Sequence, residues 1–183
     1  MTDFKNVMID LETLGTAPGS IILSIGAVAF NEGQPESEWS VFDSGPINID
    51  SSYGAGLTSD EATVAWWSRQ AEDARKLLTA AQVGGADVRK ALYGFMVWFP
   101  GGASIWSNGA SFDEPVLTAA YRVATAGAPP WAYYNSCCYR TMKNLFRNVP
   151  APEFQGLKHD ALADALHQTR HLQAILLHTQ AVR

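Results

Sequence analysis

Two acidic residues follow a strand-like apolar segment near the start of the chain, in the sequence NVMIDLETLG at residues 6–15. Asp10 and Glu12 are separated by one leucine, and side chains two apart on a strand point to the same face of the sheet. Two negative charges held side by side cost free energy unless a positive charge lies near them. That charge could belong to a lysine, an arginine or a metal ion.

Two later segments place further acids where the local structure would direct them inward. Asp113, in SNGASFDEP, follows a predicted strand and turn and lies in the first turn of a predicted helix, where capping acids are also common. Asp164, in KHDALADALHQTRHL, lies at the edge of an apolar helical stripe, where an unpaired charge is costly. His159 lies about one turn before Asp164. The other histidines are interpreted as ordinary helix-face residues: His167, His171 and His178.

Four converging carboxylates would make an oxygen-only site suited to hard cations such as Mg²⁺ or Mn²⁺. Two such ions about 4 Å apart can hold the attacking and leaving oxygens of an in-line phosphoryl displacement. The attacking water must also lose a proton, and an imidazole is suited to accept it. The sequence offers candidates for each role, the four acids for two divalent cations and His159 for the base.

Length and composition predict one domain over residues 1–183, because 47% of the residues are apolar and 17% are charged. The longest apolar run, residues 21–30, is too short to span a bilayer, and the first residues lack signal-peptide features. Cys137 and Cys138 are adjacent and are interpreted as reduced thiols of a cytoplasmic protein with no membrane partner. The net charge of −5 gives no basic signature for nucleic acid, although bound divalent cations would reverse the sign at an acidic site.

Apolar patterns and turn residues predict a mixed sheet with helices packed on it, an α/β fold. Strands are predicted at 5–11, 21–30, 38–49 and 103–109, with another short strand before residue 138. Helices are predicted at about 70–80, 86–98, 112–126, 138–147 and 160–180. An earlier helix is expected to begin near Ser59, because Thr58 and Glu61 have the spacing of a capping box.

The acidic segments resemble, in order, the three motifs of the DEDDh-type 3′–5′ exonucleases, which have the ribonuclease H-like fold. The Asp-x-Glu motif is DLETLG, the second acid follows a small-residue turn in SNGASFD, and the His-x4-Asp motif is HDALADA. The segments TVAWWSRQ (63–70) and CYRTMKNL (138–145) are similar to those of a subgroup with the small mycobacterial 3′–5′ exoribonuclease and phage-type exonucleases. The resemblance covers residues 6–172.

This resemblance implies a five-stranded mixed sheet, with the first three strands antiparallel, flanked by helices. It also implies a metal-dependent enzyme that releases nucleoside 5′-monophosphates from the 3′ ends of single-stranded DNA or RNA. Asp10 would bridge two Mg²⁺ or Mn²⁺ ions. Glu12 and Asp164 would complete the tighter-bound metal site, which holds the nucleophilic water. Asp113 would support the second ion, and His159 would deprotonate the attacking water.

The resemblance also implies contacts between Thr13 and Leu14 and the terminal nucleotide. Adjacent helix residues cannot share a face, so at least one of Trp66 and Trp67 is expected in the core. The other is a candidate for base stacking, and Trp67 is taken as the substrate-binding candidate. Three cations are candidates for phosphate contacts, although solvated surface is their ordinary role: Arg69, Arg140 and Lys143.

Other functions explain less of the sequence. A cysteine hydrolase built on Cys137 or Cys138 with His159 would leave all four acids without a role. A nuclease fold retained only for binding nucleic acid is the more serious alternative, and fold alone would not exclude it. DNA or RNA preference and strandedness stay open at this stage, and a homodimer is possible because relatives often dimerise.

Overall fold

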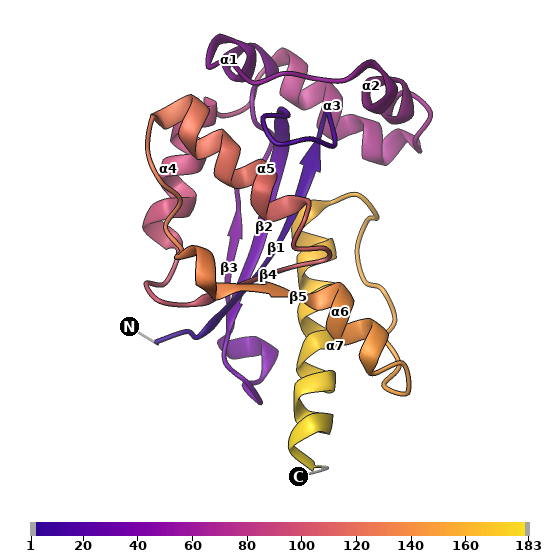
Figure 1. Ribbon diagram of the computed structural model, residues 1–183. Helices are drawn as coiled ribbons and strands as arrows, with labels where there is room; N and C mark the ends of the chain where they lie inside the picture. The colour runs from indigo at the N-terminus through magenta and orange to yellow at the C-terminus, as the bar shows by residue number, and fades with distance from the viewer. Residues whose placement is uncertain (1–2, 182–183) are drawn as a thin grey trace.

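A five-stranded mixed sheet forms the centre of residues 3–181, the part of the chain that the computed structural model describes (Figure 1). The strands are β1 (Asn6–Thr13), β2 (Ile22–Phe30), β3 (Ser40–Asp43), β4 (Ser104–Ser107) and β5 (Ser136–Cys138). Their order across the sheet is β3-β2-β1-β4-β5. β1, β2 and β3 pair antiparallel, whereas β4 is parallel to β1 and β5 is parallel to β4. The predicted α/β fold with a five-stranded mixed sheet is confirmed.

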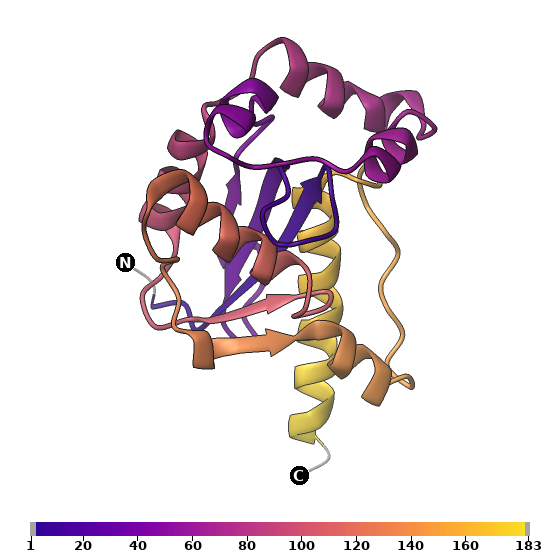
Figure 2. The same cartoon turned by 45° about the horizontal axis from the view of Figure 1, so that its top comes forward.

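Helices cover both faces of the sheet and one of its ends (Figures 1 and 2). The long helix α7 (Ala161–Ala181) and the short helix α6 (Tyr139–Leu145) lie on one face. The other face is covered by α4 (Val88–Trp98) and α5 (Asp113–Ala120). Three further helices lie across the end of the sheet where β1 finishes: α1 (Ile49–Gly54), α2 (Glu61–Trp67) and α3 (Glu72–Val83).

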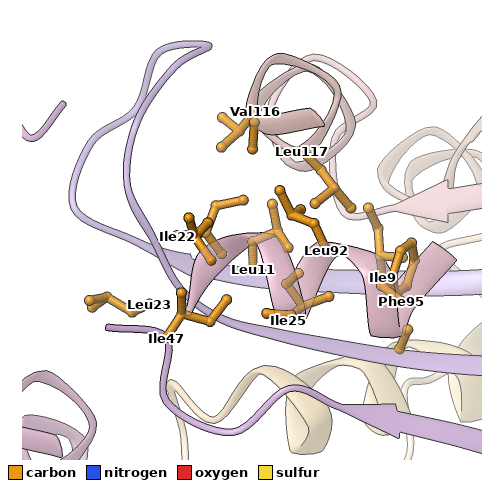
Figure 3. Close-up of a cluster of buried hydrophobic side chains, with 14 of the residues drawn as sticks. Ile9, Leu11, Ile22, Leu23, Ile25, Ile47, Leu92, Phe95, Val116 and Leu117 are labelled. Carbon is orange, nitrogen blue, oxygen red and sulfur yellow. The ribbon is translucent and has the colours of Figure 1, made fainter. Parts of the chain in front are cut away.

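Alternation along β1 divides the core into two layers. Ile9 and Leu11 point toward α4 and α5, where they pack with Phe95 and other apolar side chains (Figure 3). Met8 points to the opposite face and belongs to the cluster that includes Leu172 of α7. Because successive residues of a strand alternate between faces, the next polar residues in register with Met8 also face α7.

Two predicted boundaries differ from the structure. The strand predicted at 38–49 ends at Asp43, because Gly45 has a left-handed φ of 60° and the chain turns there. Asn48 then begins α1 by accepting a hydrogen bond from the backbone N–H of Ser51 at 2.7 Å. Thr58 does not cap α2; that role belongs to Asp60, which accepts from the backbone N–H of Thr63 at 2.7 Å.

The other helices lie close to their predicted positions, and the helix predicted at 112–126 ends in a π-helical turn at Tyr121–Thr125. Among the described residues, no helix is both long enough and apolar enough to span a membrane.

Gly26 lets the start of α7 approach the sheet. It pairs with Asp10 across β1 and β2, and a Cβ at this position would lie 2.2 Å from the backbone carbonyl carbon of Ala161. A side chain cannot occupy that space, so any larger residue would push the first turn of α7 away from β1.

We therefore expect Gly26→Ala to lower the free energy of unfolding by at least about 2 kcal/mol, because the backbone of α7 must shift. Thermal unfolding followed by circular dichroism measures the change. Gly54→Ala is the matched control, since a Cβ there has no neighbour within 4 Å. A Gly26→Ala protein that unfolds at the wild-type temperature would contradict this role for Gly26.

Candidate active site

Three of the predicted acids converge at the end of β1. Asp10 and Glu12 share the face of β1 that α7 covers, and Asp164 lies in the first turn of α7. Each offers a carboxylate oxygen, and these three oxygens all lie within 4.8 Å of one another. The structure thus brings together residues more than 150 positions apart in the sequence.

The fourth acid, Asp113, lies beside this group. It is 3% exposed and begins α5, directly after the turn that follows β4. Its Oδ1 accepts a hydrogen bond from the backbone N–H of Leu11, between Asp10 and Glu12, at 3.2 Å. Because β4 pairs parallel to β1, the carboxyl ends of both strands reach the same edge of the sheet.

The start of α7 fixes the position of Asp164. Asp160 caps the helix by accepting from the backbone N–H of Ala163 at 2.9 Å. Asp164 in turn accepts from the backbone N–H of His159 through Oδ2, at 3.1 Å. This bond holds His159 in a left-handed conformation, with φ of 64°, which is uncommon for a residue other than glycine.

The ring of His159 lies between the helix start and α2. Its centroid is 5.0 Å from that of Trp66, and the two rings are nearly perpendicular at 89°. An edge-to-face contact of this kind orients an imidazole without using either of its nitrogens. The ring nitrogens of His159 therefore stay available for hydrogen bonding near Asp164.

Burial and mutual repulsion raise the pKa values of the acids. The pKa of Asp10 lies well above its usual range, because the group is buried and Asp113, Glu12 and Asp164 repel its charge. Burial and the charge of Asp164 raise the pKa of Glu12 to about 8. Burial raises the pKa of Asp113 to about 7, although the hydrogen bond from Leu11 opposes the shift. Burial also raises the pKa of Asp164.

The chemistry of the site fits a divalent cation. Within residues 3–181, no lysine or arginine forms an ion pair with any of the four acids. All four offer only carboxylate oxygens, the ligands that Mg²⁺ and Mn²⁺ prefer. The acidic cluster is therefore compatible with divalent metal binding, as predicted from the sequence.

One residue of the site was not predicted from the sequence. Gln168 of α7 is 5% exposed, and its Nε2 donates to Oδ1 of Asp10 at 2.7 Å. The bond orients the carboxylate of Asp10 without neutralising it. A signal was present in the sequence, because Gln168 lies one turn after Asp164 and interrupts the apolar stripe between Ala165 and Leu172.

A cleft of about 460 Å³ opens beside Glu12. Its lining includes Thr13, Thr63 and the ring of Trp66. Ten residues line it: Leu11, Glu12, Thr13, Thr16, Asp60, Ala62, Thr63, Trp66, Trp67 and Phe112. Its volume is within the range of small-molecule sites.

One of the two tryptophans lies in the core, as expected, but it is Trp67, the residue taken as the substrate-binding candidate, and Leu14 is buried as well. Trp67 is 1% exposed, and its indole N–H donates to the carbonyl oxygen of Thr13 at 2.8 Å, so it supports the cleft from within the core. Trp66 is 37% exposed and is the tryptophan whose ring face is accessible. Leu14 is 3% exposed, packs in the core and does not line the cleft. Burial therefore argues against direct base contacts by Trp67 and Leu14.

Two of the remaining histidines differ from the ordinary helix-face residues that the sequence suggested. His171 is 3% exposed and is held by the hydroxyl of Tyr139 at 2.7 Å and the carbonyl oxygen of Val149 at 2.9 Å. His167 is half-buried, and its ring packs beside Phe154.

Comparison with known proteins identifies the family. The family model for the 3′–5′ exoribonuclease Rv2179c-like domain matches residues 5–176, a range that contains all five predicted catalytic residues. The chain belongs to this family. The Rv2179c-like chain is also similar in structure to cell-death related nuclease 4 (CRN-4), with a TM-score of 0.54 and 12% identity over 96% of its length. It spans 65% of the length of that nuclease, and the likeness shows the fold. No curated protein matches the sequence.

We expect Glu12→Gln to stabilise the metal-free Rv2179c-like protein at alkaline pH. The folded-state pKa of about 8 exceeds that of an ordinary glutamate, so ionising Glu12 lowers stability progressively as the pH rises toward 8. The rise in this pKa from 4.5 to about 8, at about 1.4 kcal/mol for each pH unit, corresponds to on the order of 5 kcal/mol, so the gain should approach that figure above pH 8 and largely vanish near pH 4.

Melting temperatures in EDTA at several pH values measure this effect. Glu38→Gln, at an exposed position outside the site, is the charge-matched control. A Glu12→Gln gain that is absent, or that is the same at pH 4 and pH 9, would contradict the electrostatic origin of the shift.

Proposed function

We propose that the chain is a DEDDh-type, metal-dependent 3′–5′ exonuclease that hydrolyses single-stranded nucleic acid and releases nucleoside 5′-monophosphates. The single observation that carries the proposal is the convergence of three carboxylates within 4.8 Å, with Asp113 beside them and no cationic side chain paired to them in the described residues. Membership of the exoribonuclease family supports the same conclusion.

Two divalent cations, Mg²⁺ or Mn²⁺, would be held by the four acids Asp10, Glu12, Asp113 and Asp164. When bound, these ions neutralise the carboxylates and stabilise the negative charge that develops on the phosphate during in-line displacement. Gln168 orients Asp10 for this purpose through its 2.7 Å hydrogen bond. The backbone N–H of Leu11 does the same for Asp113.

His159 would accept the proton of the attacking water at a ring nitrogen. Its backbone is fixed by Asp164 and its ring by Trp66, so the imidazole is held beside the carboxylates before substrate arrives. The oxygen of that water would bond to the phosphorus as the bond from phosphorus to the leaving 3′ oxygen breaks. The 3′ oxygen would take up a proton from solvent, and the terminal nucleotide would leave as a 5′-monophosphate.

The cleft beside Glu12 would receive the terminal nucleotide. Thr13 lies at its wall, braced by the indole N–H of Trp67, and the accessible ring of Trp66 offers a surface for the base. Stacking on an aromatic ring is tolerant of base identity, which suits an enzyme that removes every nucleotide in turn.

The purified protein with Mg²⁺ or Mn²⁺ should shorten a 5′-labelled single strand stepwise from its 3′ end, as resolved on a sequencing gel. Asp10→Ala should abolish trimming because it removes a central cation ligand, and EDTA should do the same. His159→Ala should reduce the rate by about 10²–10⁴-fold, the usual contribution of a general base.

His178→Ala is the matched control, because His178 lies near the distal end of α7 and should leave trimming unchanged. Undiminished trimming by Asp10→Ala would refute the mechanism. A wild-type protein that binds the strand with metal present but never shortens it would favour the alternative, a nuclease fold retained for binding.

We expect Trp66→Ala to raise KM for a short single strand by about tenfold, as the loss of one stacking surface does elsewhere. Steady-state kinetics with a labelled oligonucleotide separates KM from kcat. Tyr93→Ala, which removes an exposed aromatic ring from α4, serves as the control. An unchanged KM would show that the base does not rest on Trp66.

A further inference from the structure

A second cavity borders the carboxylate cluster and shares no lining residue with the cleft beside Glu12. Its volume is about 350 Å³, and it lies between α6, α7 and the loop formed by residues 146–160. Asp164 and His159 line this cavity, whereas Glu12 and Trp66 line the first cleft. The proposed reaction centre is therefore bordered by the cleft beside Glu12 on one side and by the second cavity, beside Asp164 and His159, on the other.

Polar atoms without partners are concentrated in the second cavity. Within residues 3–181, five buried side-chain oxygen or nitrogen atoms lack a hydrogen-bond partner, and three of them belong to residues that line it. These three are Oδ1 of Asn108, Nδ1 of His167 and Oε1 of Gln168. Buried polar atoms are normally paired, so a cluster of exceptions in one cavity indicates a site shaped for a polar ligand.

Gln168 shows most clearly what the ligand must offer. Its side chain is at least nine-tenths buried, and its Nε2 is already bonded to Asp10. The amide oxygen is the remaining polar atom, and together with Oδ1 of Asn108 it can only accept hydrogen bonds. The ligand must therefore bring a donor such as a hydroxyl group.

Two lysines give the same cavity a positive charge. Lys143 and Lys158 both line it, and neither forms an ion pair within the described residues. The Nζ of Lys143 lies 5.3 Å from the centroid of the Tyr139 ring, which holds the lysine toward the cavity wall without neutralising it. Ammonium groups placed in this way suit a phosphate.

We propose that this cavity binds the nucleotide that precedes the terminal one, with the lysines at its 5′-phosphate and the oxygens of Gln168 and Asn108 at its ribose. The proposal rests on the proposed function and names a second substrate site for it. In a strand cleaved at the terminal bond, the 3′ oxygen of that nucleotide is esterified, so its 2′-hydroxyl is the sugar donor available to the two acceptors. These two acceptors would therefore make the site selective for a ribonucleotide, in agreement with the exoribonuclease description of the family.

The test compares a substrate that fills both cavities with one that fills only the cleft. Hexauridylate supplies the preceding nucleotide, whereas the p-nitrophenyl ester of uridine 5′-monophosphate has none. The Lys143→Met/Lys158→Met protein should lose about tenfold in kcat/KM on hexauridylate, as expected for lost charged hydrogen bonds, and less than about twofold on the ester. Lys90→Met, which removes an exposed lysine from α4, should change neither.

The proposal of a second site would be overturned if the double lysine variant lost kcat/KM equally on both substrates, or lost none on either. If the wild-type protein hydrolyses neither substrate, the proposed function has failed. The second site can then still be tested by measuring how tightly the protein binds hexauridylate. Fluorescence anisotropy of 5′-labelled hexauridylate in EDTA should then show weaker binding for the double variant than for Lys90→Met. Equal affinities in that measurement would overturn the site as well.

The ribose assignment has its own control. A hexauridylate with one 2′-deoxyuridine at the position before the terminal nucleotide should be cleaved with a lower kcat/KM than one with 2′-deoxyuridine three positions further upstream. Asn108→Ala should reduce this difference, because it removes one of the two acceptors. Equal kcat/KM values for the two strands would contradict the assignment of the ribose to Gln168 and Asn108.

Discussion

Repulsion among buried carboxylates is the constraint on which the rest of the structure depends. Asp10, Glu12 and Asp164 are held within 4.8 Å of one another, and burial adds to the free-energy cost of ionising them. The fold overcomes this cost with rigid elements: the central strand β1, and the long helix α7, whose first turn packs against the neighbouring strand β2 at Gly26. The cluster therefore lowers the stability of the metal-free fold at this edge of the sheet, and its geometry is compatible with the binding of a divalent cation.

The periodicity of apolar residues along single strands and helices predicted which way three of the acids point. The alternation along β1 placed Asp10 and Glu12 on one face, and the apolar stripe of α7 directed Asp164 inward. Both placements follow from period and burial, which a single sequence contains. The five-stranded sheet with its first three strands antiparallel was implied by the resemblance to the DEDDh-type exonucleases, and the structure confirms it.

Features that depend on tertiary contacts did not follow from the sequence: Gln168 was not predicted as part of the site, and the buried tryptophan was taken as the accessible one. Trp66 and Trp67 have the same chemistry, and the hydrogen bond from Trp67 to Thr13 decides which of them is buried. Leu14 lies beside the acids in sequence, but the turn after β1 directs it into the core. Gln168 acquires its role only because α7 packs across β1. None of these outcomes follows from the spacing of neighbours along the chain.

The central proposal is that the four acids together hold two divalent cations, and Mn²⁺ binding followed by electron paramagnetic resonance tests it most directly. We predict that the wild-type protein binds two Mn²⁺ ions and that Asp10→Asn, which keeps the shape of the side chain and removes its charge, loses both. Retention of Mn²⁺ by Asp10→Asn with unchanged affinity and number would contradict the account.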